Sequence, residues 1–158
     1  MLAPRIVHAD LPPDQPAKRI VHELDGIDRP VEPYRLLLTG SELWGAWVDA
    51  HSDVVPDVLI GLGTSSIIPT IAVSIAAGLP YQLVWPFGRV PSTHVHGKRV
   101  LVVDDQVIHG YTLASFIAAL RDEGADVVGA LCLIEDTTGT GRLRVESTGV
   151  TLCVAKTL

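Results

Sequence analysis

The sequence predicts an α/β fold in which a twisted parallel sheet is flanked by helices on both faces. Three apolar runs without polar alternation, centred on Leu59, Leu101 and Leu131, are typical of strands buried on both sides. The first two runs are each followed by a segment with the apolar period of a helix. Repeated strand–helix alternation favours a parallel sheet with right-handed crossovers. We expect residues 1–158 to form a single domain, with residues 1–33 as a smaller region outside the sheet.

The N-terminal part offers few periodic signals. Residues 1–33 are rich in proline and mixed in charge, and one short helix is expected at Pro16–Leu24, where proline suits the first turn. Tyr34–Leu38 reads as a short strand. Thr39 and Glu42 have the spacing of a capping box, which predicts a helix from there to about His51. One face of that helix carries Leu43, Trp44, Trp47 and Val48, which we interpret as core packing, with base stacking as the alternative.

A second unit begins with a buried strand at Asp57–Leu62. The small residues Gly63, Thr64, Ser65 and Ser66 follow it, and a helix is predicted at Ile67–Ala77. Backbone amides and hydroxyls at a strand-to-helix turn are suited to holding phosphate. The spacing does not fit a dinucleotide-binding turn, because position 66 is not glycine. Tyr81–Trp85 is predicted to be the next strand.

The most informative stretch is the strand from Val100, which runs into Asp104 and Asp105. A loop follows, and then a helix whose apolar face carries Leu113, Phe116, Ile117 and Leu120. Such a loop aims free N–H groups and the positive end of the helix dipole at an anion, most often a phosphate. Gly110 permits close approach of the backbone. Carboxylates repel phosphate, so their partners are sugar hydroxyls or a hydrated Mg²⁺. A sugar phosphate with a metal satisfies both halves.

The acidic pair has two other interpretations. Receiver domains of response regulators also end an apolar strand in two acids that bind magnesium. Their acids lie near the N-terminus, whereas only 53 residues follow Asp105 here, too few for the remaining strand–helix units. The other alternative is a pair of acids with a purely structural role.

The C-terminal part continues the alternation. Asp126–Glu135 is predicted to be a strand, DTTGTG a turn, Arg142–Ser147 a short helix or coil, and Thr151–Val154 the last strand. Cys132 and Cys153 lie in these apolar strands and read as small buried hydrophobes of a reducing compartment, so we expect a cytoplasmic protein. The net charge of -6 without a Lys/Arg cluster argues against nucleic acid. We expect no membrane span, no signal peptide and no zinc site.

The segment VLVVDDQVIHGYTL (residues 100–113) resembles the phosphoribosyl-pyrophosphate motif of type I phosphoribosyltransferases: an apolar strand, two acids, a loop, then Gly-x-Thr opening a helix. The following RDEGADVVGALCLIEDTTG is similar to the orotate branch of that family. The resemblance implies transfer of ribose 5-phosphate from phosphoribosyl pyrophosphate (PRPP) to a base, with release of pyrophosphate. It implies an orotate-like pyrimidine first and a purine second, Mg²⁺ as cofactor, and a homodimer.

The resemblance also implies roles for individual residues. Asp104 and Asp105 would hold the ribose hydroxyls, directly or through water on magnesium. The 5-phosphate would bind to Gln106, Val107, Ile108, His109, Gly110, Tyr111 and Thr112, and pyrophosphate to Gly63, Thr64, Ser65 and Ser66. Residues 1–33 would be a hood over the base or a dimer arm. Further candidates are Arg89, His94, His96 and Glu135.

Three departures from the family pattern leave alternatives open. His109 stands where the family usually has Thr or Ser, no Arg-Lys pair follows Tyr81–Trp85, and VPSTHVHG (residues 90–97) lacks the lysines of the orotate enzymes' loop. A non-catalytic module that binds PRPP or a nucleotide is therefore the second hypothesis. Transfer to an unusual acceptor is the third.

Overall fold

The computed structural model describes residues 5–8, 18–26, 30–85 and 92–158. Its centre is a five-stranded sheet in which every pairing is parallel, in the order β4-β3-β5-β6-β7. The strands are β3 (Val58–Leu62), β4 (Tyr81–Val84), β5 (Arg99–Val107), β6 (Asp126–Glu135) and β7 (Thr151–Thr157). The predicted parallel sheet is confirmed.

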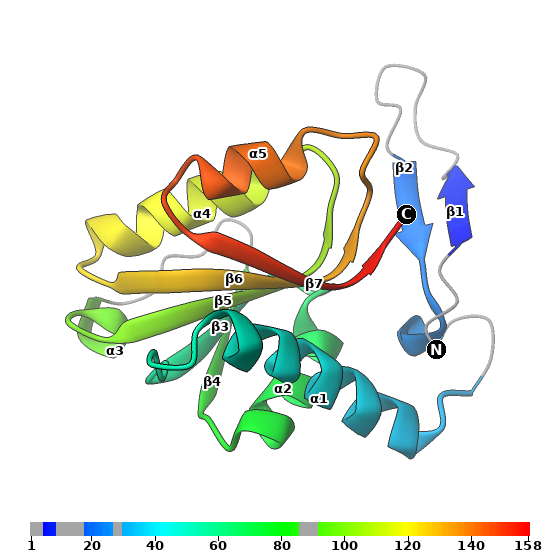
Figure 1. The fold of residues 1–158 in the computed structure, drawn as a ribbon, viewed down its shortest axis with the longest axis horizontal. Coiled ribbons are helices and arrows are strands. Elements are labelled where there is room, and N and C mark those ends of the chain that lie inside the picture. The colour runs from blue at the N-terminus through cyan, green and yellow to red at the C-terminus, as the bar shows by residue number, and fades with distance from the viewer. Residues whose placement is uncertain (1–4, 9–17, 27–29, 86–91) are drawn as a thin grey trace.

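Helices cover both faces of the sheet, as predicted (Figure 1). One face carries α1 (Pro33–Ala50) and α2 (Ile67–Ala77), and the other carries α4 (Tyr111–Asp122) and α5 (Gly141–Glu146). Each face has its own apolar cluster, one around Val102 and Ile117 and the other around Trp47 and Leu131. Among the described residues, no helix combines the length and apolarity needed to cross a bilayer.

The helix expected at Pro16–Leu24 is wrong. Lys18–Val21 is strand β2, which pairs antiparallel with β1 (Arg5–His8), and a short 3₁₀ turn, η1 (Glu23–Asp25), follows. The β-branched residues Ile20 and Val21 favour strand over helix. Figure 1 shows this hairpin beyond the end of the sheet at which β5, β6 and β7 finish, where a hood over a ligand would lie.

The strand expected at Tyr34–Leu38 is also wrong, because helix α1 begins at Pro33 and takes in this segment. Proline at the first helical position costs no hydrogen bond, and a short apolar run does not distinguish strand from helix. Thr39 is buried inside the helix rather than capping it. Beside it, a Cβ on Gly40 would lie 2.2 Å from the Ala72 carbonyl oxygen, so glycine allows α1 and α2 to pack closely.

The aromatic stripe on α1 forms core, as we expected. Leu43 and Trp47 are fully buried against the sheet, and a Cβ on Gly129 would lie 2.2 Å from the Trp47 ring. Val48, predicted on the same face, is 42% exposed. The base-stacking alternative therefore has no support from Trp47.

Candidate functional site

The two predicted phosphate loops lie on adjacent strands at one edge of the sheet. From β3 the chain crosses to β4 on one side, whereas β5 leads to β6 and β7 on the other side. The carboxyl ends of β3 and β5 thus flank the switch point of the topology, where ligands of open α/β sheets bind. The loop at Gly63–Ser66 follows β3, and the bend at Ile108–Gly110 follows β5.

Strand β5 runs further than the sequence suggested. Val103 pairs with Gly61 near the end of β3, yet β5 continues along β6 until Val107 pairs with Glu135. Gln106 and Val107, expected in the phosphate loop, are therefore strand residues, because the long neighbouring strand β6 offers them backbone partners. The bend itself is only Ile108–Gly110, between β5 and α4.

Asp104 and Asp105 lie in this overrun, side by side and each only 8% exposed. Burial, and next to it the neighbouring Asp105 carboxylate, raise the pKa of Asp104 well above its usual value. A hydrogen bond from the Asp105 N–H to Asp104 Oδ1, of 2.9 Å, opposes this rise. Within the described part of the chain, neither acid forms an ion pair with Lys or Arg. Acids buried together without a cation are typical of functional sites.

A cavity of about 290 Å³ opens beside Asp104. It is lined by Asp104, Gln106, Val107, Ile108, His109, Gly110, Tyr111, Thr112 and Leu113. The lining contains all seven residues that the sequence assigned to the 5-phosphate. Of the two acids, Asp104 lines the cavity and Asp105 lies next to it on the strand.

The carbonyl groups of the bend are all held by other parts of the chain. The Val107 and Ile108 carbonyls accept from the backbone N–H groups of Asp136 and Gly141, each at 2.9 Å, and the Gly110 carbonyl accepts from Ala114. Arg144 Nη1 donates to the His109 carbonyl at 3.2 Å.

The amide groups of the bend, by contrast, have no acceptor among the described residues. Across 108–112, no backbone N–H donates a hydrogen bond to the described part of the chain. In a trans peptide the N–H points opposite to the C=O, so fastening the carbonyls turns these amides the other way. With the first turn of α4, they form an anion site of the kind found at helix N-termini.

Glycines let the bend rest on the turn between β6 and α5. Gly110 has φ +71°, and a Cβ there would lie 2.7 Å from the Gly141 carbonyl oxygen. A Cβ on Gly139 or Gly141 would lie 2.0 or 2.8 Å from the Ile108 carbonyl oxygen. The sequence predicted DTTGTG only as a turn, and the support that this turn gives to the bend was not predicted. We call the turn with Gly139 and Gly141 the buttress. Its two glycines were the available signal, because glycine is often found where another part of the backbone approaches closely.

The loop after β3 offers fewer groups than predicted. Ser66 is fully buried, and its hydroxyl donates to the Gly63 carbonyl at 3.1 Å, so it stabilises the turn. Thr64 and Ser65 are exposed. A smaller cavity of about 100 Å³ lies beside this loop, lined by Gly63, Thr64, Ile67, Leu83, Val84 and Trp85.

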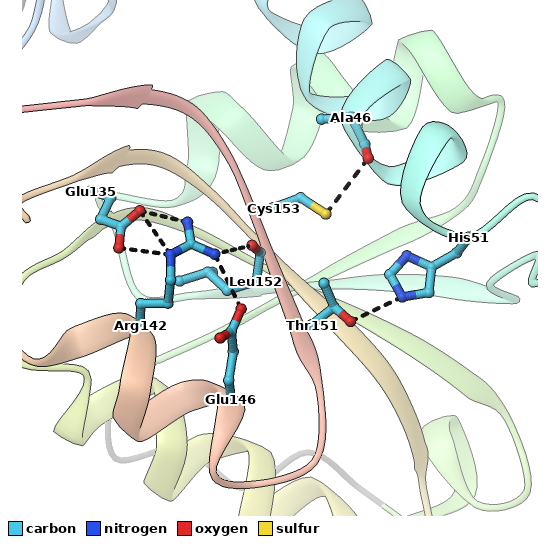
Figure 2. A network of polar contacts seen from close by, with 8 residues as sticks. All are labelled: Ala46, His51, Glu135, Arg142, Glu146, Thr151, Leu152 and Cys153. Carbon is cyan, nitrogen blue, oxygen red and sulfur yellow. Dashed lines mark hydrogen bonds and ion pairs between the residues drawn. The ribbon is translucent and has the colours of Figure 1, made fainter.

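Glu135 is near the site but is engaged in an ion pair. Arg142 binds its carboxylate through Nε and Nη2, at 2.9 and 2.5 Å, and also bonds Glu146 and the Leu152 carbonyl (Figure 2). One guanidinium thereby joins the end of β6, α5 and β7. Its partners are protein groups, which indicates that Glu135 anchors the buttress.

The structure does not bring the two candidate histidines to the site. His94 belongs to a short helix, α3 (Ser92–Val95), and His96 follows it. His94 is exposed and contacts Gln82 Oε1 through Nδ1 at 3.0 Å. His96 lies against Gly124, just before β6 begins, at the opposite edge of the sheet from the bend. Arg89 lies outside the described residues.

Comparisons with known proteins agree with this geometry. Residues 64–156 match the model of the phosphoribosyl transferase domain family. The chain is 28% identical over 135 residues to adenine phosphoribosyltransferase of Rhodospirillum centenum, covering 70% of this chain and 79% of that protein. A shorter match, 40% over 47 residues, links it to orotate phosphoribosyltransferase of Methylorubrum populi, covering 30% of this chain and 24% of that protein. The adenine phosphoribosyltransferase structure from Rhodothermus marinus shares the fold, with a TM-score of 0.77 and 21% identity over 99% of this chain and 94% of that one.

Proposed function

This chain belongs to the phosphoribosyltransferase family, and we propose that it transfers ribose 5-phosphate from PRPP to a nitrogenous base, releasing pyrophosphate. The observation that carries the proposal is the run of free amides at Ile108–Thr112 beside the buried acids Asp104 and Asp105. The amides suit a phosphate monoester. Carboxylates a few residues away suit hydroxyls or a cation, and a ribosyl phosphate presents both.

The two loops divide the donor between them. The 5-phosphate binds at the bend, and the ribose hydroxyls bind at Asp104 and Asp105. Pyrophosphate lies toward Gly63, Thr64 and Ser65, because the loop after β3 is on the neighbouring strand. The fully buried Ser66 is left out of this set, since its hydroxyl is already bonded.

The chemistry needs no covalent intermediate with the protein. The bond from ribose C1 to the pyrophosphate oxygen breaks, a bond from C1 to a ring nitrogen of the base forms, and that nitrogen loses its proton. Positive charge develops at C1 as the leaving group departs. The carboxylates of Asp104 and Asp105 stabilise this charge electrostatically, and the bend fixes the sugar relative to them.

A magnesium ion fits the donor set. Within the described part, no three His, Cys, Asp or Glu side chains cluster so as to hold a metal alone. Mg²⁺ commonly binds through one or two carboxylates together with substrate phosphates and water, which matches two adjacent acids. We propose that Asp104 and Asp105 hold it indirectly, through ribose hydroxyls or water. When bound, it would neutralise charge on the departing pyrophosphate.

We propose that the acceptor is a purine, and adenine in particular, rather than a pyrimidine. The motif at residues 100–139 favours the orotate branch, but the relative that spans 70% of the chain is an adenine enzyme, whereas the orotate relative spans 30%. The longer alignment compares more than twice as much of this chain, so it carries more weight.

The test is pyrophosphate release from PRPP and Mg²⁺ with adenine, hypoxanthine, xanthine, orotate or uracil as acceptor. We expect turnover with adenine, and loss of most of it in Asp105→Asn, which keeps the size of the side chain. Absence of release with every base would contradict the proposal. Tight calorimetric binding of PRPP without turnover would instead support a non-catalytic PRPP-binding module, which His109 and the lysine-free segment 90–97 favour.

We also propose that the protein is a homodimer through the outer face of α1. Tyr34, Leu37 and Leu38 occupy positions i, i+3 and i+4 and are 55%, 51% and 54% exposed. An apolar stripe of this kind on a helix is typical of an interface rather than of surface facing water.

A further inference from the structure

The bend is shaped by three donors that hold three successive carbonyl groups. Two of them are backbone N–H groups, from Asp136 and Gly141, which only a substitution by proline would remove. The third is a side chain, because Arg144 on α5 donates from Nη1 to the His109 carbonyl at 3.2 Å. The orientation of the His109–Gly110 peptide therefore depends on Arg144.

This peptide joins His109 to a glycine, whose backbone has no side chain to restrict its rotation. Gly110 has φ +71° and no side chain, and glycine rotates more freely than any other residue. When the His109 carbonyl points to Arg144, the N–H of Gly110 points the opposite way. Without the guanidinium, the peptide is free to turn and to withdraw that N–H from an anion.

A second contact fixes the guanidinium itself. Arg144 Cζ lies 3.5 Å from the centre of the Tyr111 ring, and Tyr111 is the first residue of α4 and lines the cavity. A planar guanidinium can stack on the ring while its edge donates to the carbonyl, which an ammonium group cannot do. In the described part of the chain, no acid forms an ion pair with Arg144, so its charge is not neutralised beside the anion site.

From these contacts we propose that Arg144 is a positioning residue for the 5-phosphate. It orients the His109–Gly110 peptide and adds positive charge at a bend where His109 replaces the usual hydroxyl residue. The inference rests on the proposed function, since it assumes that the bend binds a ribosyl phosphate. It requires no direct contact between Arg144 and the ligand.

The experiment compares Arg144→Met with Arg121→Met in the full chain. Arg121, on α4, also donates from Nη1 to a backbone carbonyl, that of Thr148, so both variants lose one charge and one such bond. Methionine keeps most of the length and the packing of the side chain. Calorimetry measures the affinity for ribose 5-phosphate, and thermal unfolding reports stability.

We expect Arg144→Met to lower the affinity for ribose 5-phosphate by about tenfold or more, which is the effect of losing a charged hydrogen bond. The affinity of Arg121→Met should stay within about twofold of the wild type. The KM for PRPP should rise with little change in kcat. Arg144→Lys should recover only part of the affinity, because lysine cannot stack and donate together. In ¹⁵N spectra, the Gly110 amide should shift with ligand in the wild type and respond more weakly in Arg144→Met.

Equal affinities of Arg144→Met and Arg121→Met, with a normal Gly110 response, would overturn the inference but leave the proposed function intact. Full recovery by Arg144→Lys would also overturn it, since charge alone would then suffice. Should Arg144→Met fail to fold, Tyr111→Leu tests the stacking contact, and an unchanged affinity there would contradict the proposal. A wild type that binds no ribose 5-phosphate would remove both the inference and the proposed function.

Discussion

The surroundings of Asp104 disfavour the charged form of its side chain. Burial and the neighbouring Asp105 raise the pKa of Asp104, so the folded protein binds its proton more tightly than the unfolded chain does. Stability must then fall as the pH rises from the unfolded pKa toward the raised folded pKa, and the loss is complete above it. Functional sites commonly carry such a cost in stability.

Asp104→Asn should therefore stabilise the protein at neutral pH, by about 1 kcal/mol, while removing most of the transferase activity. The asparagine oxygen can still accept the bond from the Asp105 N–H. The gain should grow between acidic and neutral pH, because below the unfolded pKa the wild-type acid is neutral in both states. Thermal unfolding across that range checks this. A gain that is constant with pH, or a loss at neutral pH, would contradict it.

Gly110 is constrained in two ways, by positive φ and by the Gly141 carbonyl. Gly97 has the same φ of +71°, but a Cβ added there would meet no other atom. A substitution at Gly97 therefore measures the cost of the positive φ alone. We expect Gly97→Ala to cost about 1 kcal/mol of stability and leave ligand binding intact. Gly110→Ala should lower the stability by more than that. It should also lower the affinity for ribose 5-phosphate by about tenfold, because the anion site would be displaced. Equal effects on binding would argue against the close approach.

The elements that form the site differ in how visible they are in the sequence. The strand, the acids, the bend and the helix from Val100 to Asp122 were predicted because each signal is local: an apolar run, polar residues after it, glycine, and then helical periodicity. The buttress at Gly139 and Gly141 was not predicted, since its role depends on contacts with Ile108, some thirty residues earlier. The overrun of β5 depends in the same way on the length of β6.

The wrongly predicted elements have a common cause. Tyr34–Leu38 and Lys18–Val21 are short segments whose structure is set by residues outside them: the first is the beginning of the long helix α1, and the second pairs with β1. Each segment follows a proline, but only one of the two prolines starts a helix. Strand β2 begins shortly after Pro16, whereas Pro33 is the first residue of α1.

The Arg142 ion pair should hold β6, α5 and β7 together (Figure 2). Arg142→Met leaves the Glu135 carboxylate, 6% exposed, without its partner. We expect a loss of about 2 kcal/mol, below the range for fully buried pairs because the arginine side chain is 37% exposed. Adding Glu135→Gln should restore part of it. Arg99→Met, which breaks an exposed pair with Asp57, is the control and should lower the melting temperature much less.

Over the whole molecule, the order β4-β3-β5-β6-β7 explains why residues 45 apart in sequence form one site. Sequence alternation predicted a parallel sheet, but it did not predict which strands are neighbours, because strand order is set by long-range packing. Once β3 and β5 are adjacent, the loops after them meet at the switch point. The hairpin of β1 and β2 stands at that same end of the sheet (Figure 1).

The proposed dimer can be tested by placing a charge on the exposed face of α1. Leu38→Glu places a charge on the exposed apolar face of α1, and we expect it to shift the protein from dimer to monomer in sedimentation experiments. Leu143→Glu is the control, because Leu143 is 74% exposed on α5, on the other side of the sheet. A wild type that sediments as a monomer, or equal effects of both variants, would contradict this interface.

We propose that the free amides and buried acids at the end of β5 bind one ribosyl phosphate. The most direct measurement is a crystal structure of the protein with PRPP and Mg²⁺. We predict the 5-phosphate oxygens within hydrogen-bond distance of the amides of residues 108–112, and the ribose hydroxyls facing Asp104 and Asp105. A phosphate bound elsewhere, or a sugar turned away from both acids, would contradict it.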